Sequence, residues 1–476
     1  MTHELNAVPN KEDALARWLA AKFGLFVHWG PYSVAGVEAS WPIMAPELAA
    51  AAFGPSPPIS EADYVLLPQR FNPVDFDPRE LVRLARQAGM RYIVFTAKHH
   101  DGFCMFDAPG TDYKVTRTPY GRDICAELAE ACADGGLDLC FYYSQPDMHH
   151  PGYRDVTKPV ASNWLGEPKR EEWAGYLDYM EAHVRKLLTD YGEVRVLWFD
   201  GLSGHDKYDP PRFHRLIQEL SPNTLVNDRL GGGYDYITPE QFIPRSGIPI
   251  KHEVGRLSDG HFRALLALFR VPGVQALLKR WARKYAEGSL QLGNVPTASY
   301  PSPDRFQPWE TCMTMNRTWA YNPADKAYRP AAELIYNLVE ITSRGGNYLL
   351  NVGPSPQGTF PPEAVERLST IGRWMDVNGE SIHGATYGPL QHLLFGRTTA
   401  KGDAVYLHIY DWPSSGRISL GAMPGPVSEV VLLAENKPLP FQQKGNHFTI
   451  EVPVGAPDPL ISVLAIRLEP TQAKES

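Results

Sequence analysis

The stretch Val196-Leu197-Trp198-Phe199-Asp200-Gly201 is a short apolar run that ends abruptly on a carboxylate. Side chains alternate along a β-strand, so the Trp198 indole and the Asp200 carboxylate share one face. Several other apolar runs in this chain also end on polar or aromatic groups. This repetition predicts a barrel whose strands all open, at their C-terminal ends, onto one active site.

Short apolar runs alternate with longer amphipathic segments over the first two-thirds of the 476 residues. We expect strands at 23–28, 91–97, 137–143, 194–199, 224–228, 310–314 and 348–352. We expect helices at 79–88, 123–134, 169–190, 212–220, 331–343 and 363–377. This alternation predicts a largely parallel sheet, and the lack of a glycine-rich loop after the first strand favours a barrel over a dinucleotide-binding fold. One or two helices are short or missing, so we expect an irregular barrel.

The pattern changes after Gly384, where short apolar segments are separated by Pro and Gly without a long helix. The predicted fold class is therefore α/β, with an irregular (β/α)8-like barrel over 1–383 and a small C-terminal antiparallel β-sandwich over 384–476. Within the barrel, residues around 255–300 combine apolar positions at helical spacing with a basic face, which predicts a helical insertion. We interpret it as packed on the barrel rim, with a lid or a contact in a homo-oligomer as the alternative.

The composition argues against several classes of protein. The formal net charge is −8 and no block of Lys or Arg is present, so we expect no nucleic-acid partner. No uncharged apolar stretch is long enough to span a membrane, and the first residues lack the pattern of a signal peptide. The five cysteines include no C-x-x-C pair. We therefore expect a cytoplasmic protein with buried free thiols.

The expected strand ends carry the chemistry. They lie at 26–30, 97–103, 140–144, 197–201 and 226–229, and supply His, Trp, Tyr, Asp and Arg side chains. Brought to one mouth, these groups form a pocket with aromatic walls, hydrogen-bonding groups and a carboxylate, which suits a monosaccharide. The pairs His99-His100 and His149-His150 lack the usual spacing of metal ligands, so no metal and no other cofactor is expected.

A hydrolase that uses two carboxylates remains as the reaction class. Ser144 has no flanking glycines of a nucleophile elbow, which makes serine chemistry a weak interpretation. Asp200 at a strand end is the natural nucleophile. Its partner must protonate the leaving oxygen, and Glu240 and Glu310 both qualify.

Five motifs resemble, in the same order, those of glycoside hydrolase family 29, the α-L-fucosidases; they are residues 23–30, 97–103, 198–201, 309–321 and 345–354. The resemblance implies that Asp200 forms a covalent fucosyl-enzyme intermediate. It implies that the substrate-binding residues are His28, Trp41, His99, His100, one of Tyr142 and Tyr143, Trp198 and Arg229. The chain departs from the family at Ser40-Trp41, where many members carry an acid before the tryptophan, and Glu38 is nearby but out of register.

The resemblance leaves two positions for the acid/base. We favour Glu240, because it follows Asn227-Asp228-Arg229 at a suitable spacing, and keep Glu310 as the alternative. The expected function is that of a retaining, exo-acting α-L-fucosidase that takes a fucosylated oligosaccharide or glycoside as substrate. The alternatives are an α-L-galactosidase and a non-catalytic fucose-binding protein on the same scaffold.

Overall fold

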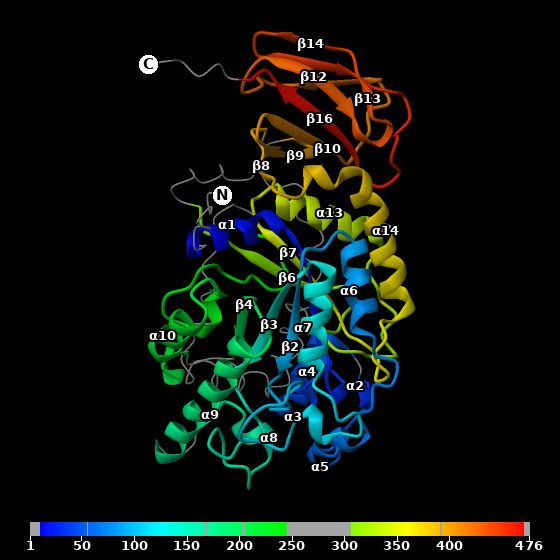
Figure 1. Cartoon of the computed structure of the whole chain (residues 1–476). Coiled ribbons are helices and arrows are strands. Elements are labelled where there is room, and N and C mark those ends of the chain that lie inside the picture. Colours follow the sequence, from blue (N-terminus) through cyan, green and yellow to red (C-terminus); the bar gives the residue numbers. More distant parts are fainter. Residues whose placement is uncertain are drawn as a thin grey trace, which may run out of the picture.

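The structure is a computed structural model that describes residues 10–54, 56–166, 170–201, 205–244, 306–390 and 393–470. The helical insertion expected around 255–300 lies outside these residues. Figure 1 shows two parts, a domain of helices around a parallel sheet and, at the top of the view, a layered set of antiparallel strands. The α/β barrel-like fold with C-terminal antiparallel sheets is thereby confirmed.

The first part is built on one sheet of seven strands in the order β5-β4-β3-β2-β1-β7-β6, with every neighbouring pair parallel. The strands are β1 (Phe23–Val27), β2 (Tyr92–Lys98), β3 (Asp138–Ser144), β4 (Val194–Asp200), β5 (Leu225–Val226), β6 (Glu310–Thr314) and β7 (Asn347–Val352). Each corresponds to an expected strand. Their nearly continuous burial is typical of parallel strands that are covered on both faces.

An irregular segment closes the barrel between the two edge strands. Bridges join Tyr236 to Asn227 after β5, and Ile237 to Trp309 before β6. Further along, the Cys312 amide donates to the Pro239 carbonyl at 3.1 Å. Between β5 and this closing segment, residues 235–241, the only helix is the short 3-10 turn η4 (Asp228–Leu230). The expected irregularity of the barrel is found here.

In the described ranges, longer helices cover the outside of the sheet (Figure 1). They are α6 (Pro78–Gln87), α7 (Ile124–Gly135), α9 (Arg170–Thr189), α10 (Pro210–Leu220), α13 (Ala331–Thr342) and α14 (Pro362–Asn378). Aspartates start several of them: the Asp77 and Asp123 side chains accept hydrogen bonds from first-turn amides of α6 and α7. All six were expected from their apolar spacing, and none is long and apolar enough, nor is any other helix of the described ranges, to cross a membrane.

Two separate apolar clusters lie on the two faces of the sheet. The inner one fills the barrel and includes Phe26, Val196 and Leu349. Helix α1 (Lys11–Ala21) closes the N-terminal end of the barrel by inserting Trp18 into this cluster. The outer cluster packs the sheet against its helices. All five cysteines are free and buried, as expected.

The antiparallel part contains two sheets. One has the order β13-β12-β16-β10-β9-β8 and the other β11-β15-β14. The strands are β8 (Thr386–Tyr387), β9 (Gly396–Lys401), β10 (Ala404–Ile409), β11 (Arg417–Leu420), β12 (Val427–Leu432), β13 (Lys437–Pro438), β14 (Phe441–Lys444), β15 (His447–Glu451) and β16 (Ser462–Leu468). The two sheets share a core that includes Leu407, Ile418 and Phe448, which makes them the expected β-sandwich.

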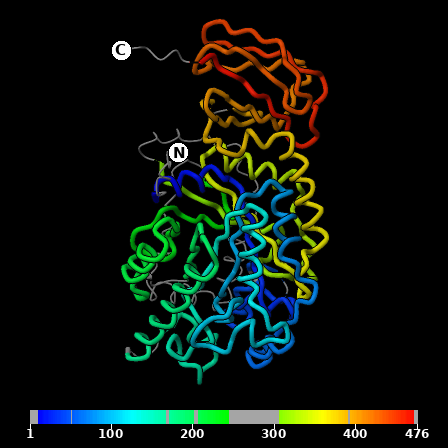
Figure 2. The backbone as a smooth tube through the Cα atoms, in the orientation of Figure 1, coloured from blue at the N-terminus to red at the C-terminus, as the bar shows by residue number. Residues whose placement is uncertain are grey.

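The sandwich lies at the end of the barrel away from the strand mouths. Short helices that follow β1 and β3, namely α3 (Trp41–Met44), α4 (Pro46–Phe53), α5 (Glu61–Val65) and α8 (Val160–Asn163), lie at the opposite end of the molecule (Figure 1). The backbone path in Figure 2 shows the same separation, with the orange and red strands stacked beyond the yellow helices. The sandwich therefore does not contribute to the mouth.

A buried carboxylate joins the two parts. Glu340 of α13 is 3% exposed and accepts hydrogen bonds from Tyr410 Oη and Arg397 Nε, each at 2.9 Å. Arg344, one turn later on α13, pairs with its other oxygen. Two arginines thus share one buried anion at the junction.

We expect Glu340→Gln to lower the melting temperature without changing kcat. Neutralising the anion leaves two arginines without compensation, which costs on the order of 3 kcal/mol for groups this buried. The control is Glu333→Gln on the same helix, whose pair with Arg329 is partly exposed and is expected to contribute less than about 1 kcal/mol. Equal effects of the two changes in a thermal melt would contradict this account.

Candidate active site

Polar and aromatic side chains from five strand ends meet at the mouth of the barrel. His28 follows β1, and its ring centroid lies 5.7 Å from that of His99 after β2 and 5.5 Å from that of Tyr142 on β3. Asp200 ends β4, and Asn351 of β7 contacts the His28 ring nitrogen. The structure thus brings together His28, His99, Tyr142 and Asp200, which the strand-end argument selected, and adds Asn351.

His99 and His100 both reach the mouth because they lie beyond the end of β2, where side chains no longer alternate between the two faces of the sheet. In β2, Thr96 pairs with Tyr142 but Lys98 pairs with Tyr143, so one extra residue is inserted at this point. The strand then ends at Lys98, and the two imidazole rings lie 4.4 Å apart. Regular alternation would have sent them to opposite faces.

Asp200 is held as an ionised carboxylate. Its Oδ2 accepts from Tyr142 Oη at 2.7 Å and its Oδ1 accepts from Arg229 Nη1 at 2.9 Å. Burial alone would raise the pKa of Asp200, but the Arg229 charge and the hydrogen bonds from Tyr142 and Arg229 outweigh it and lower that pKa. The side chain is still 14% exposed at the mouth. It is therefore a charged and accessible nucleophile candidate.

Arg229 joins the two candidate catalytic carboxylates. Its Nη1 donates to Asp200 and its Nη2 donates to Glu240 Oε2 at 2.8 Å. Its Nε donates to Thr238 in the closing segment, so three partners fix the planar guanidinium. Glu240 is 38% exposed and faces the mouth with Asp200. One cation therefore holds both acids at the mouth of the barrel.

Backbone contacts fix the position of Glu240. Both the amide and the hydroxyl of Thr238 donate to the Asp228 carboxylate. After Glu240, Gln241 adopts a positive φ of 60°, and its amide donates to the Cys312 carbonyl on β6 at 2.9 Å. A positive φ is unfavourable for a residue with a side chain, so the flanking hydrogen bonds must hold it.

Pairing with β4 decides between the two adjacent tyrosines. Tyr142 pairs with Trp198, and the two rings stack inside the barrel with centroids 5.5 Å apart. Tyr143 pairs with Phe199 and points outward, where its hydroxyl contacts His183 Nδ1 on α9. Tyr142 is therefore the tyrosine at the mouth, and Tyr143 belongs to the outer core.

Trp198 and Glu310 lie below the mouth. The Arg229 guanidinium covers the Trp198 ring at 4.6 Å, and the indole, 1% exposed, donates to Glu310 Oε1 at 3.2 Å. Tyr92 donates to the other Glu310 oxygen. Burial raises the pKa of Glu310 to about 7, although the two donors oppose the shift. Trp198 thus supports Arg229 from beneath, and the Glu310 carboxyl is bound on the far side of the indole.

The loop after β1 contributes Trp41 and Ser40. The Trp41 ring lies edge-on to His100 with centroids 6.4 Å apart, and Ser40 Oγ lies 2.9 Å from His99 Nδ1. Glu38 turns to the loop that follows β6, where its carboxyl group accepts from the backbone amides of Trp319 and Ala320. Burial raises the pKa of Glu38 to about 8 despite these bonds. It holds the loop that follows β6.

Three further residues belong to the site although the sequence argument did not select them. Ser144 and Asn351 contact the ring nitrogens of His100 and His28, each at 2.7 Å. Trp319 lies beside His28 with ring centroids 5.0 Å apart. Ser144 and Asn351 are polar residues at the C-terminal ends of β3 and β7. The argument that selected Asp200 from the end of its strand would therefore also have selected these two residues. Trp319 follows β6 in a loop and has no periodic signal.

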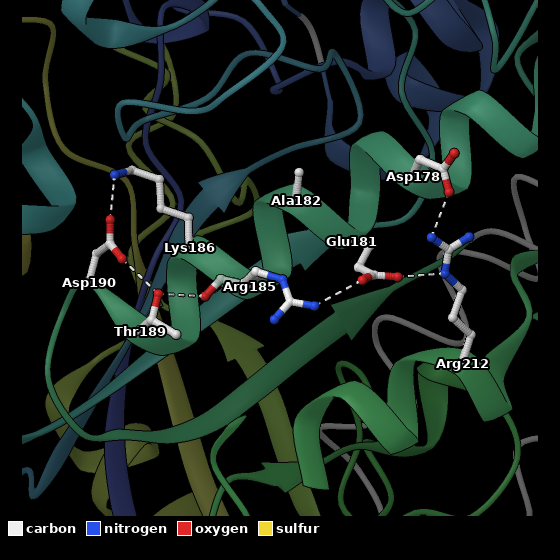
Figure 3. A pocket seen from close by; sticks show the side chains of 8 residues that line it. All are labelled: Asp178, Glu181, Ala182, Arg185, Lys186, Thr189, Asp190 and Arg212. Carbon is white, nitrogen blue, oxygen red and sulfur yellow. Dashed lines mark hydrogen bonds and ion pairs between the residues drawn. The ribbon is translucent and has the colours of Figure 1, made fainter. Parts of the chain in front are cut away.

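A second depression lies between α9 and α10, and its lining lacks the aromatic rings that line the mouth (Figure 3). Its charged lining residues are Asp178, Glu181, Arg185, Lys186, Asp190 and Arg212. They pair with one another, for example Arg212 with both Asp178 and Glu181. In the part of the chain that the structure describes, no three His, Cys, Asp or Glu side chains are grouped as a metal site.

Comparisons with known proteins agree on one family. A family model described as Alpha-L-fucosidase matches residues 3–262 and 272–380. An alpha-L-fucosidase of Dictyostelium discoideum is 25% identical over 92% of this chain and 88% of its own length. A tissue alpha-L-fucosidase of Rattus norvegicus is 29% identical over 85% of this chain and 78% of its own length.

Solved structures extend this similarity. Alpha-L-fucosidase isoenzyme 1 from Paenibacillus thiaminolyticus has 32% identity and a TM-score of 0.77, covering 96% of this chain and 99% of its own. A GH29 alpha-L-fucosidase from Bacteroides thetaiotaomicron, solved as a trapped covalent intermediate with 2-fluoro-fucosyl fluoride, has 24% identity and a TM-score of 0.72. That alignment covers 97% of both chains and shows the shared fold.

We expect Glu310→Gln to stabilise the protein at alkaline pH while leaving it folded and active. The folded-state pKa is raised, so the native state retains a proton that the unfolded chain loses, and stability falls as pH rises from about 4.5 to about 7. Above pH 7 the cost of the buried charge is on the order of 3 kcal/mol. The difference in melting temperature between variant and wild type should therefore be larger at pH 8 than at pH 4.5. A difference that does not change with pH would contradict a raised pKa of Glu310 in the folded protein.

Proposed function

The chain belongs to the alpha-L-fucosidase family of glycoside hydrolases and is an α-L-fucosidase; from this premise we propose that it removes terminal α-L-fucosyl residues with retention of configuration. The substrate is a fucosylated oligosaccharide or glycoside. The observation that carries the proposal is the shared guanidinium of Arg229, which holds Asp200 and Glu240 side by side at the mouth. Retaining glycosidases require two carboxyl groups about 5 Å apart.

Asp200 is the proposed nucleophile and Glu240 the proposed acid/base. In the first step Asp200 attacks the anomeric carbon while protonated Glu240 gives its proton to the departing oxygen. In the second step Glu240 removes a proton from water, which attacks the anomeric carbon and releases Asp200. The trapped covalent intermediate of the Bacteroides relative supports this route.

Arg229 contacts both proposed catalytic groups. Its Nη1 donates to Asp200 and its Nη2 donates to Glu240, so one planar guanidinium fixes the position of one acid relative to the other. When Asp200 becomes an ester in the first step it loses its charge, and its ion pair with Arg229 is lost with it.

The placement of Glu310 supports Glu240 as the acid/base. A general acid must reach the leaving oxygen outside the ring of the bound sugar. Glu310 is 1% exposed, and both of its oxygens are taken by Tyr92 and Trp198 below the mouth. Glu240 is accessible from solvent on the side where an aglycone would leave. The remaining proposed sugar contacts are His28, Trp41, His99, His100, Tyr142 and Arg229.

We expect Asp200→Asn to reduce turnover of a nitrophenyl α-L-fucoside at least about a thousandfold, because the covalent route is lost. The amide keeps the shape of the carboxylate and one acceptor for Tyr142 or Arg229. The matched control is Asp138→Asn, at the other end of the neighbouring strand, which should keep its activity. Equal turnover by wild type and Asp200→Asn would remove the proposed nucleophile.

The same assay separates the alternative functions. A higher kcat/KM on the nitrophenyl α-L-galactoside would identify an α-L-galactosidase. Binding of L-fucose without turnover of either glycoside would identify a sugar-binding protein.

We expect Glu240→Ala to slow substrates with poor leaving groups by about 100-fold or more, because they depend on proton donation. A dinitrophenyl fucoside, whose leaving group needs little protonation, should be affected much less in the glycosylation step. Glu310→Gln is the control and should show no such selectivity. Selective loss in Glu310→Gln, with a uniform small effect in Glu240→Ala, would reverse the assignment.

A further inference from the structure

The hydrogen-bond partners behind two mouth histidines determine which ring nitrogen carries the proton. His100 Nδ1 lies 2.7 Å from Ser144 Oγ, and His28 Nδ1 lies 2.7 Å from Asn351 Oδ1. A neutral imidazole has one N–H donor and one acceptor nitrogen. Whether Ser144 and Asn351 donate or accept therefore decides whether Nε2 of each histidine is a hydrogen-bond donor or an acceptor.

Ser144 has a single hydroxyl proton. Its Oγ lies 2.7 Å from the carbonyl oxygen of Pro146, an atom that can only accept, so the hydroxyl proton is directed there. The Ser144 oxygen is then available to His100 only as an acceptor. His100 Nδ1 must supply the proton of the bond between them.

Asn351 leads to the same result for His28. Its Nδ2 donates to the Trp319 carbonyl at 2.7 Å, and the opposite amide orientation would place two acceptor oxygens against each other. The Asn351 Oδ1 atom therefore faces His28, whose Nδ1 donates to it. Both rings carry their proton on the side away from the sugar pocket.

The outward nitrogens are consequently unprotonated in the neutral rings. Burial lowers the pKa of His28 and of His100 to about 4, although Asp200 opposes the shift in both. His100 Nε2 lies 3.6 Å from Asp200 Oδ2, beyond hydrogen-bond distance, and that oxygen already accepts from Tyr142. Two acceptors face each other there, and a ligand hydroxyl can satisfy one of them.

We propose that Ser144 and Asn351 are positioning residues that fix His100 and His28 as hydrogen-bond acceptors, so that the pocket selects sugars with free hydroxyl donors at two positions. The inference rests on the proposed function and specifies its substrate class. A methyl ether, an ester or a sulfate at either position lacks the required proton. A buried acceptor left without a donor costs about tenfold to hundredfold in affinity.

His99 provides a matched comparison. Its Nδ1 lies 2.9 Å from Ser40 Oγ, but in the described part of the chain the Ser40 hydroxyl has no second acceptor that would direct its proton. Either ring tautomer of His99 is compatible with this contact. The hydroxyl proton of Ser144 is directed to a second acceptor, whereas that of Ser40 is not. This difference sets the tautomer of His100 and leaves that of His99 open.

The first test reads the tautomers directly by NMR of the full chain labelled with 15N-histidine, assigned with His28→Gln and His100→Gln. Near pH 7 we expect a pyridine-type Nε2 signal for both residues. Ser144→Ala should convert the His100 signal toward the pyrrole type, because Nδ1–H then has no acceptor while the negative charge of Asp200 favours a proton on Nε2, and should leave His28 unchanged. Asn351→Leu should change the His28 signal alone, and Ser40→Ala should change neither.

A pyrrole-type or doubly protonated Nε2 in the wild type would overturn the inference. So would an unchanged His100 signal in a folded Ser144→Ala. These readings do not require turnover, so they remain valid if the protein fails to hydrolyse fucosides.

The second test compares L-fucose with its mono-O-methyl derivatives as competitive inhibitors of the wild-type enzyme. We expect two of the derivatives to bind about tenfold to hundredfold more weakly than the parent sugar. Inhibition by every derivative as strong as that of L-fucose would refute the selection of hydroxyl donors. Absence of L-fucose binding would refute the selection together with the proposed function, whereas the NMR result stands by itself.

Discussion

The geometry of the site depends on the hydrogen bonds that close the barrel between β5 and β6. The closing segment, residues 235–241, takes the place of a regular strand, and it carries Thr238 and Glu240. Without it, Arg229 would lose the partner of its Nε and the second carboxylate would not face Asp200. The hydrogen bonds that close the barrel therefore also position Glu240 relative to Asp200.

Charge at the mouth is balanced by few groups. Arg229 faces two carboxylates, and the three neighbouring histidines are kept neutral by burial, which lowers their pKa values. Their ring nitrogens offer hydrogen bonds without adding charge. This arrangement suits a neutral polyol, because the ion pairs of Arg229 lie at the atoms where charge changes during reaction.

The sequence predicted the parts of the structure that follow from periodicity. Strand and helix positions agreed to within two residues, because each element has one face or two faces of regular burial. The choice between Tyr142 and Tyr143 needed the pairing with β4, which alternation alone does not specify. Glu240 could not be separated from Glu310 by pattern, because the closing segment has no regular period. His99 and His100 come together beyond the end of β2, where the course of the chain is likewise set by tertiary contacts.

Strand β10, in the six-stranded sheet of the sandwich, is buried on both faces. Along β10, Val405 and Leu407 enter the core of the sandwich, whereas Ala404 and Tyr406 belong to the same apolar cluster as the outer helices of the barrel. Cutting the chain after the barrel would therefore uncover part of the core of the catalytic domain. The two parts should therefore unfold as one cooperative unit.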